Sequence, residues 1–367
     1  MKYLLRLTSA YFDLLRLRSA QVAQYKSLST SRSVQVFSLI IFGITVFSCK
    51  KKEATVVPPP TPTTTAATVP YGEPDSVWTA TGTGPRLIFK FKFDSTQVRL
   101  NNFGNPNPTI PAGHGAYSPV FNKMAAHYIE LAPNDLTALG SGVVLYHAPE
   151  TAIGGATAIQ FSQSIVVREN VIFFSAPLSA VTTGSYKWLR LSLSYQNYDI
   201  PYKANALLTT NHIGTGTIAS FLGYKTYVEK YKVKNQFIIP STSVGGPNAN
   251  HLQGYWGFET YIAGYGYYMA DGQPAAGSTT VVNPNFANSP IPAGSCVVTS
   301  VFTNTASVAQ NLTITGTETQ DIIITIFVST NKSFEWIDMT PDGYYQPENG
   351  ETPVDMGVRG IIPKVQY

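Results

Sequence analysis

Alternation of apolar and polar residues is the sequence feature that most limits how this chain can fold. Residues 87–93 place three Phe on one face of an extended strand and two Lys on the other. Successive side chains of a strand point to opposite faces, so this segment can cover a core with one face. Residues 188–195 repeat the pattern, with Leu and Tyr expected inside and Arg190, Ser192 and Ser194 expected outside.

Other segments extend this pattern to most of the C-terminal half of the chain. The apolar run 321–328 has the length of a buried central strand, and 312–315 and 224–233 are predicted as further strands. Residues 121–126 and 219–222 are predicted as short helices. No segment carries a long apolar stripe at helical spacing.

Clusters of Gly, Pro and Asn separate the predicted strands, for example at 101–108 and 244–250. Thr, Tyr, Phe and Val are frequent, and only 13% of residues are charged. These features predict an all-β protein, an antiparallel β-sandwich of immunoglobulin-like type with long loops. No repeat of fixed period is present, which disfavours solenoids and propellers.

The N-terminal part has the pattern of a targeting segment. The apolar stretch 34–47 is too short to span a bilayer comfortably, and it leads into Ser48 and Cys49. This arrangement resembles the signal peptide and lipobox of a bacterial lipoprotein. Residues 1–48 are therefore predicted as a signal peptide, and Cys49 as the site of acylation by palmitate-like chains. An uncleaved signal anchor with an incidental cysteine is the alternative.

Residues 49–76 are predicted as a tether between the lipid and a globular domain at 77–367. Prolines and threonines between Val57 and Thr65 favour an extended chain, because proline cannot donate to a helix or a sheet. About 290 residues then remain for the globular domain, which is enough for a sizeable core.

Charge and cysteine content exclude two classes of function. Six of the 25 Lys and Arg and one of the 21 Asp and Glu lie in residues 1–48, which leaves 19 basic and 20 acidic residues. No basic face for nucleic acid is expected in the mature chain. With Cys49 acylated, Cys296 has no partner, so neither a disulfide framework nor a multi-cysteine zinc site is expected. Cys296 is predicted as a buried strand thiol.

Several segments together resemble the MbnP-like proteins, β-sandwich envelope proteins found beside copper-peptide systems and among Bacteroidota lipoproteins. These segments are 87–94, 121–131, 183–190, 251–259 and 264–272. The resemblance implies a β-sandwich in the cell envelope. It also implies copper bound by a histidine and an oxidised tryptophan, roles that would fall to His251 and Trp256.

The five histidines are candidates for metal ligands. None forms a His-x-His or His-x3-His pair, so no local metal site is encoded. His127 and His147 lie on adjacent predicted strands and are expected to be able to face each other, where they could complete a site with His251 and Trp256. The alternative is that each is a surface or packed histidine.

No catalytic motif is present, and the protein is not expected to be an enzyme. There is no Gly-x-Ser-x-Gly elbow, and the carboxylates Asp199 and Glu259 are the only weak candidates for acid-base chemistry. The acidic loop 335–355 offers oxygen ligands for calcium, although Met339 and Pro341 interrupt the usual loop pattern.

Aromatic residues are densest in residues 255–268. Tyr255, Trp256 and Phe258 are candidates for binding a glycan or an apolar ligand. The alternative is that they pack the sheet.

Together these features predict a non-enzymatic cell-envelope protein held by its N-terminal lipid in a membrane, expected to be the outer membrane, on the periplasmic or the surface leaflet. It is expected to bind a metal or a small ligand, with copper as the first candidate and calcium as the second. The alternative function is a cell-surface recognition or adhesion module for a glycan or a protein.

Overall fold

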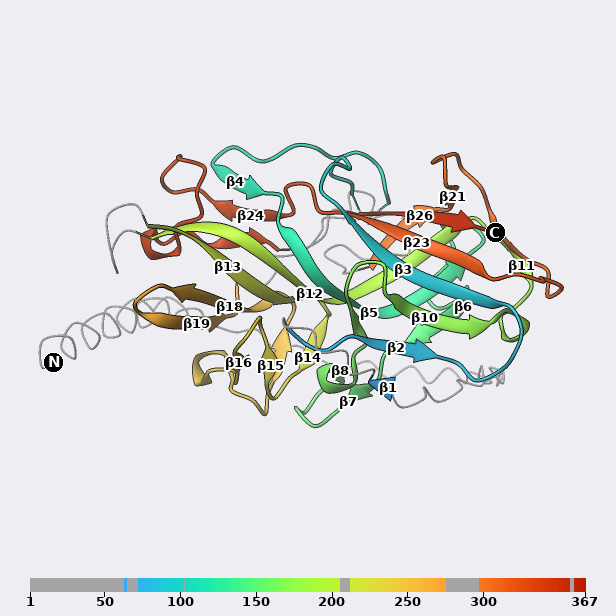
Figure 1. Cartoon of the computed structure of the whole chain (residues 1–367), viewed down its shortest axis with the longest axis horizontal. Helices are drawn as coiled ribbons and strands as arrows, with labels where there is room; N and C mark the ends of the chain where they lie inside the picture. Colours follow the sequence, from blue (N-terminus) through green and yellow to red (C-terminus); the bar gives the residue numbers. More distant parts are fainter. Residues whose placement is uncertain (1–62, 65–71, 102, 205–211, 275–296, 357–359) are drawn as a thin grey trace, which may run out of the picture. The chain divides into compact units, whose positions relative to one another are not determined.

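The computed structural model describes residues 63–64, 72–101, 103–204, 212–274, 297–356 and 360–367 (Figure 1). All of them belong to one compact unit that begins at Val57. Their regular elements are strands and 3-10 turns of three residues, so the all-β prediction is confirmed. None of these elements is a helix long and apolar enough to cross a membrane. Cys49 and Cys296 lie outside the described residues.

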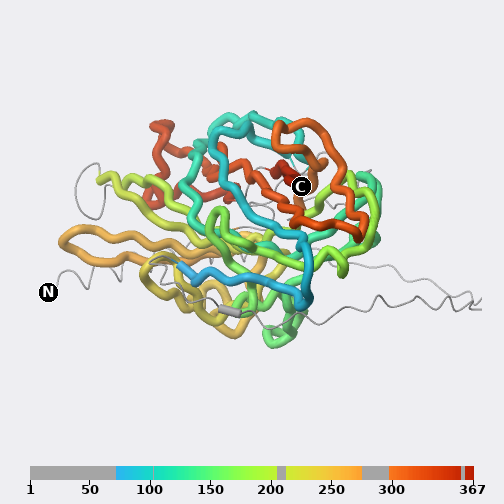
Figure 2. The backbone as a smooth tube through the Cα atoms, turned by 45° about the vertical axis from the view of Figure 1, so that its right-hand side comes forward, coloured from blue at the N-terminus to red at the C-terminus, as the bar shows by residue number. Residues whose placement is uncertain are grey.

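One layer of the fold is a seven-stranded sheet with the order β1-β2-β10-β3-β23-β26-β21. Three of its strand pairs are parallel, namely β2 with β10, β3 with β23 and β21 with β26. Figure 2 shows the early strand β3 running beside the late, orange-red strand β23. The strands are β1 (Thr63–Thr64), β2 (Ser76–Thr79), β3 (Arg86–Asp94), β10 (Ile172–Pro177), β21 (Thr303–Asn304), β23 (Ile322–Ser329) and β26 (Ile361–Gln366).

The second layer is an antiparallel eight-stranded sheet with the main order β19-β18-β13-β12-β5-β6. The long strand β12 pairs with β5 on one side and with both β20 and β13 on the other, while β9 pairs with β5. The strands are β5 (Val120–Ala132), β6 (Val143–His147), β9 (Val166–Val167), β12 (Trp188–Ala204), β13 (His212–Phe221), β18 (Tyr255–Ile262), β19 (Gly266–Gly272) and β20 (Val297–Val301).

Four small sheets cover parts of these two layers. A three-stranded sheet contains β4 (His114–Tyr117), β24 (Phe334–Ile337) and β25 (Pro353–Asp355), and a four-stranded sheet contains β7 (Glu150–Thr151), β8 (Ala158–Gln160), β14 (Lys225–Tyr227) and β17 (Asn250–Leu252). Two further sheets have two strands each, one with β11 (Gly184–Tyr186) and β22 (Leu312–Ile314), the other with β15 (Tyr231–Lys232) and β16 (Phe237–Ile238). The 3-10 turns are η2 (Phe161–Gln163), η3 (Leu178–Ala180), η4 (Thr242–Val244) and η5 (Pro347–Asn349).

The main core lies between the two large sheets. Alternate residues of β3 and β23 face alternate residues of β5 and β12, and all of these side chains are buried. Phe89, Phe91, Leu189, Leu191 and Ile324 are members of this core, as their positions in the alternating segments predicted. Each large apolar side chain removed from water contributes about 1.5–3 kcal/mol, which favours the sandwich over separate sheets.

Two further aromatic clusters cover the other parts of the eight-stranded sheet. One gathers Tyr195, Phe221, Tyr231 and Tyr255 under the small sheets. The other gathers Tyr198, Phe258, Phe334 and Trp336 against β24.

Two short helices were wrongly predicted. Residues 121–126 lie in β5 and residues 219–222 begin in β13, both central strands of the eight-stranded sheet. Pairing along β12 on both sides outweighs the local helix preference of these short segments, because a strand ladder satisfies every backbone group.

The polar face of β12 was also wrongly predicted. Arg190, Ser192 and Ser194 are buried rather than exposed. Glu130 on the neighbouring strand lies 3.5 Å from the Arg190 guanidinium, and Arg190 also donates to the carbonyl of Asp135. A strand in the middle of a sheet that is covered on both faces buries its polar residues too. Arg190 finds partners there, whereas the Ser194 hydroxyl has no hydrogen-bond partner among the described residues.

Residues 72–76, which the sequence analysis assigned to the tether, pack against the sandwich. The Glu73 carboxylate accepts a hydrogen bond from the backbone of Lys232 at 2.6 Å. Asp75 forms an ion pair with Arg168 at 2.6 Å and another with Lys123 at 3.5 Å. The packed part of the chain therefore begins at least as early as Gly72.

Candidate metal centre

Three potential metal ligands meet at the edge of the eight-stranded sheet. His127 lies in β5, and His147 is the last residue of the edge strand β6. The backbone amide of Ala148 donates to the carbonyl of His127 at 2.7 Å, which holds the end of β6 against β5. The chain then enters β7, whose first residue is Glu150.

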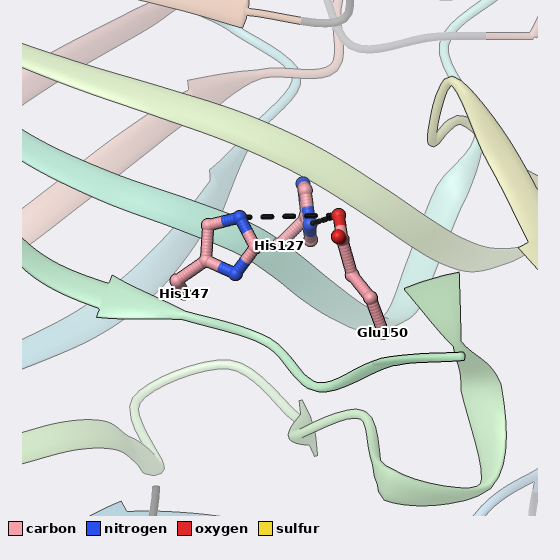
Figure 3. A group of neighbouring side chains, drawn as sticks. All are labelled: His127, His147 and Glu150. Atoms are coloured by element: carbon pink, nitrogen blue, oxygen red, sulfur yellow. Dashed lines mark hydrogen bonds and ion pairs between the residues drawn. The ribbon is translucent and has the colours of Figure 1, made fainter. Parts of the chain in front are cut away.

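The side chains of these three residues point toward one another (Figure 3). One ligand atom from each lies within 4.8 Å of the other two. Glu150 Oε1 is 3.0 Å from His127 Nε2 and 3.9 Å from His147 Nε2. The two imidazole rings have centroids 4.6 Å apart at an interplanar angle of 61°. In the part of the chain that the structure describes, no other group of three such side chains converges in this way.

These distances fit a small ion. Around a tetrahedral ion with ligands at about 2.0–2.2 Å, neighbouring ligand atoms lie about 3.3 Å apart. The two distances to Glu150 bracket that value, and all three ligand atoms lie within 4.8 Å of one another, so the side chains need only close around an ion to bind it.

Tyr224 adds a fourth polar group. It stands directly before β14, and its hydroxyl donates to Glu150 Oε1 at 2.9 Å. Its ring centroid is 5.8 Å from that of His127. This hydrogen bond fixes the orientation of the carboxylate, as groups around a metal ligand commonly do.

The protonation of the histidines suits metal binding. His127 is only 9% exposed, and burial, followed by the neighbouring His147, lowers its pKa to about 4. It is therefore neutral at pH 7, and its Nε2–H donates to Glu150 Oε1 at 3.0 Å, so an ion bound at Nε2 would take the place of that proton. His147 Nδ1 lies 3.1 Å from the carbonyl of Ala148. That hydrogen bond places the proton on Nδ1 and leaves the lone pair of Nε2 facing Glu150.

Exposure differs along the cluster. The side chain of His147 is 45% exposed and that of Glu150 is 27% exposed, in contrast to His127. An ion can therefore reach the site from solvent on the His147 side. One buried and two accessible ligands leave coordination positions for water, as in open zinc sites.

Two of the four predicted metal ligands are brought together, and two are not. His127 and His147 face each other, as expected from adjacent strands. His251 lies in β17, buried, with its ring stacked on Tyr255 at 4.2 Å. Trp256 lies in β18, and its indole packs against Gly272 of β19. His251 belongs to no group of three ligand atoms among the described residues.

The predicted ligand-binding aromatics are mostly core residues. Tyr255 is fully buried and donates to Asp271 at 2.9 Å, and Phe258 is nearly buried. For these two residues the packing alternative agrees with the structure, while Trp256 is half-buried. The exposed aromatic side chains lie farther along the same hairpin, at Tyr261, Tyr265, Tyr267 and Tyr268.

The described carboxylates of the acidic loop form no group of three with converging oxygens. Glu335 forms an ion pair with Arg99 at 2.7 Å and lies 2.6 Å from His114. Asp342 pairs with Lys203 at 2.6 Å, and Glu351 accepts the backbone amide of Gln346. These carboxylates each have protein partners and do not converge on one point.

The carboxylates considered for acid-base chemistry hold a loop in place. Glu259 accepts the backbone amides of Lys234, Asn235 and Gln236. Asp199 pairs with the Lys234 ammonium at 2.9 Å. These hydrogen bonds and this ion pair give both carboxylates a structural role.

Sequence reasoning missed Glu150 and Tyr224. Glu150 follows His147 by three residues, so the spacing of these two could have been noticed. Tyr224 is 74 residues from Glu150, and no local pattern marks it.

Comparison of the chain with protein-family models, with curated proteins and with solved structures finds no match in any of the three.

Proposed function

We propose that this protein is a lipid-anchored cell-envelope protein that binds one divalent transition-metal ion without catalysing a reaction. The observation that carries the proposal is the convergence of His127, His147 and Glu150, whose ligand atoms lie within 4.8 Å of one another. The rigid β5–β6 pair positions the two imidazoles, so little ordering is needed when the ion binds.

The ligand set favours Cu²⁺ or Zn²⁺. Two neutral imidazoles and one carboxylate suit these ions better than Mg²⁺ or Ca²⁺, which prefer oxygen ligands. Cu²⁺ binds most tightly among the first-row divalent ions at a given nitrogen and oxygen site. Copper in a β-sandwich is also what the MbnP-like resemblance implies, although His127, His147 and Glu150 are different ligands from His251 and Trp256.

Equilibrium dialysis of the full chain against Cu²⁺, and separately against Zn²⁺, tests the proposal. The wild-type chain is expected to bind one equivalent of at least one of these ions. Glu150→Gln removes the anionic ligand and should weaken binding at least tenfold. Glu169→Gln is the matched control, because Glu169 is a similarly exposed carboxylate that pairs with Lys92 elsewhere. Absence of binding by the wild-type chain, or unchanged binding by Glu150→Gln, would contradict the proposal.

The membrane location is supported by the apolar stretch 34–47, by Ser48 and by the position of Cys49. Several acyl chains on one cysteine would hold the protein at a membrane stably. Cys49→Ser should lose labelled palmitate and leave the protein in the soluble fraction. Retention of both label and membrane attachment would refute acylation at Cys49.

A recognition or adhesion module is the second candidate function. It is favoured by the four exposed tyrosines at the end of the β18–β19 hairpin, of which Tyr265 is 72% exposed. Tyrosine rings supply large contact area at low entropic cost in binding surfaces. Binding to a glycan array that is lost in Tyr267→Ala would favour this function.

A further inference from the structure

A cavity of about 320 Å³ has none of His127, His147 and Glu150 in its lining. It lies between the start of β2, the segment from β8 to β9, and the chain after β14. Its volume falls at the lower end of the range for small-molecule sites. Glu73, Gln160, Phe161, Ser164, Glu229 and Phe237 are among the residues that line it.

Ser164 is the polar group in this cavity that most needs a partner. Its side chain is only 9% exposed, and its hydroxyl has no hydrogen-bond partner among the described residues. Its backbone amide is fixed by a 2.9 Å hydrogen bond to the carbonyl of Phe161. A buried hydroxyl without a partner costs about 1–3 kcal/mol. The hydroxyl oxygen of Ser164 is buried in the described conformation, so the side chain must rotate toward the cavity before a polar ligand can remove that cost.

Other polar groups in the cavity wall are already oriented by the protein. Tyr227 donates to one oxygen of Glu229 at 2.9 Å. The backbone of Lys232 donates to one oxygen of Glu73 at 2.6 Å. Gln163 donates to the amide oxygen of Gln160 at 3.0 Å, so the amide nitrogen of Gln160 is the end with hydrogens to donate. The wall therefore offers both acceptors and donors in fixed positions.

The charges of the wall disfavour ionic ligands. Two carboxylates and the single ammonium of Lys230 line the cavity, which disfavours phosphate and other anions. A cation gains little, because Glu73 lies close to the charge of Lys123 and Glu229 already accepts from Tyr227. Lys230 and Lys232 also lie over the ring of Phe237, at 5.7 and 6.0 Å from its centroid.

We propose that this cavity binds a neutral saccharide unit. Ring hydroxyls would donate to Glu73 and Glu229 and satisfy Ser164, while the apolar face of the sugar would lie on the part of the Phe237 ring that Lys230 and Lys232 leave uncovered. Carboxylates that are held by other groups and still have lone pairs available are suited to hydroxyl donors. The site is independent of the metal centre, since none of His127, His147 and Glu150 lines the cavity.

Titration calorimetry of the full chain tests this proposal. The probes are neutral trisaccharides of glucose, mannose, galactose, xylose or N-acetylglucosamine, with inorganic phosphate and spermidine as charged probes. At least one trisaccharide is expected to bind, and neither charged probe. Failure of every trisaccharide to bind at millimolar concentration, or binding of a charged probe alone, would overturn the proposal.

Variants locate the binding. Ser164→Ala should weaken it about 3- to 10-fold, the range that one hydrogen bond gives. Ser220→Ala is the matched control, because Ser220 is also buried with an unpartnered hydroxyl but does not line the cavity. Phe237→Ala should weaken binding too, and His147→Ala should not. Equal binding by Ser164→Ala, Phe237→Ala and wild type would place the saccharide elsewhere and refute this site.

Discussion

His127 with His147, and His251, lie beside aromatic residues in two different parts of the described chain, and these two regions differ in what surrounds the imidazole. At the edge of β5 and β6, His127 and His147 face a carboxylate and a tyrosine hydroxyl. In the short strand β17, His251 is stacked on Tyr255 and buried. The first region, the metal cluster, has ligand atoms that converge near solvent. The second region, the aromatic cluster around Tyr255, uses its histidine as a packed ring.

This contrast shows that a histidine acquires its role from residues that other strands bring to it. The family resemblance that the sequence analysis proposes would direct attention to residues 251–259, where the aromatic residues are dense. The geometry directs it to His127 and His147, where a carboxylate completes the set. Substitutions in the aromatic cluster should therefore affect stability, and substitutions in the metal cluster should affect metal affinity.

The largest effect is expected for Tyr255→Ala. Tyr255 packs on His251, Phe221 and Tyr231 and is fully buried, so its removal leaves a large cavity. The free energy of unfolding should fall by about 3–5 kcal/mol in urea titrations. Tyr261→Ala is the control, because Tyr261 is exposed on the same strand and should cost less than about 1 kcal/mol. Similar losses for both variants would contradict the packing role.

His147→Ala should have the largest effect on the metal. Loss of one of three protein ligands should weaken binding of Cu²⁺ or Zn²⁺ about 100-fold or more, which corresponds to about 2.7 kcal/mol. Unfolding of the metal-free variant should change by less than about 1 kcal/mol, because this side chain is half exposed. His251→Ala should give the reverse result, with lower stability and unchanged affinity. Loss of metal binding in His251→Ala but not in His147→Ala would contradict this assignment of the two histidines.

Stability should depend on pH through His251. Burial lowers the pKa of His251 below its usual value near 6.5, although the charge of Asp271 offsets part of this. The unfolded chain then binds more protons below pH 6.5, so this stabilisation is complete above pH 6.5 and is lost as pH falls. Each unit of lowering is worth about 1.4 kcal/mol.

Urea titrations between pH 4 and 8, with a chelator present, measure this dependence. His251→Gln should flatten the rise of the unfolding free energy with pH relative to wild type, while contributions of the other histidines cancel in the difference. Parallel curves for the two proteins would show that His251 does not titrate differently in the folded state.

The smallest effect is expected for Tyr224→Phe. This change removes the hydrogen bond to Glu150 but keeps the ring beside His127. A bond of this kind is worth about 0.5–1.5 kcal/mol, so metal affinity should fall about 2- to 10-fold. Tyr265→Phe, at an exposed position away from the carboxylate, should leave the affinity unchanged. No difference between these two variants would remove Tyr224 from the site.

The sequence predicts the fold where alternation alone decides the structure. Phe89 and Phe91 are buried as predicted, and the apolar run 321–328 is a central strand between β3 and β26. The prediction from the sequence is wrong where the burial of a residue depends on a partner that is distant in the sequence. Arg190 was expected in solvent because it is charged, but Glu130 from the adjacent strand and a covering loop bury it.

The candidate site was predictable only in part, because alternation locates two of its residues and not the others. Adjacent strands bring His127 and His147 together, and the alternating pattern of the sequence locates those strands. Glu150 reaches the site from β7 and Tyr224 from the position directly before β14, two strands of a four-stranded sheet whose pairing no local pattern encodes. Short strands that pair over long sequence distances carry little periodic signal.

Anomalous scattering from crystals grown with Cu²⁺ or Zn²⁺ tests the central claim most directly. Data collected on either side of the metal absorption edge should show one strong peak between His127 Nε2, His147 Nε2 and the carboxylate of Glu150. A peak beside His251 and Trp256, or no peak within reach of His127 and His147, would contradict the assignment of the metal to this cluster.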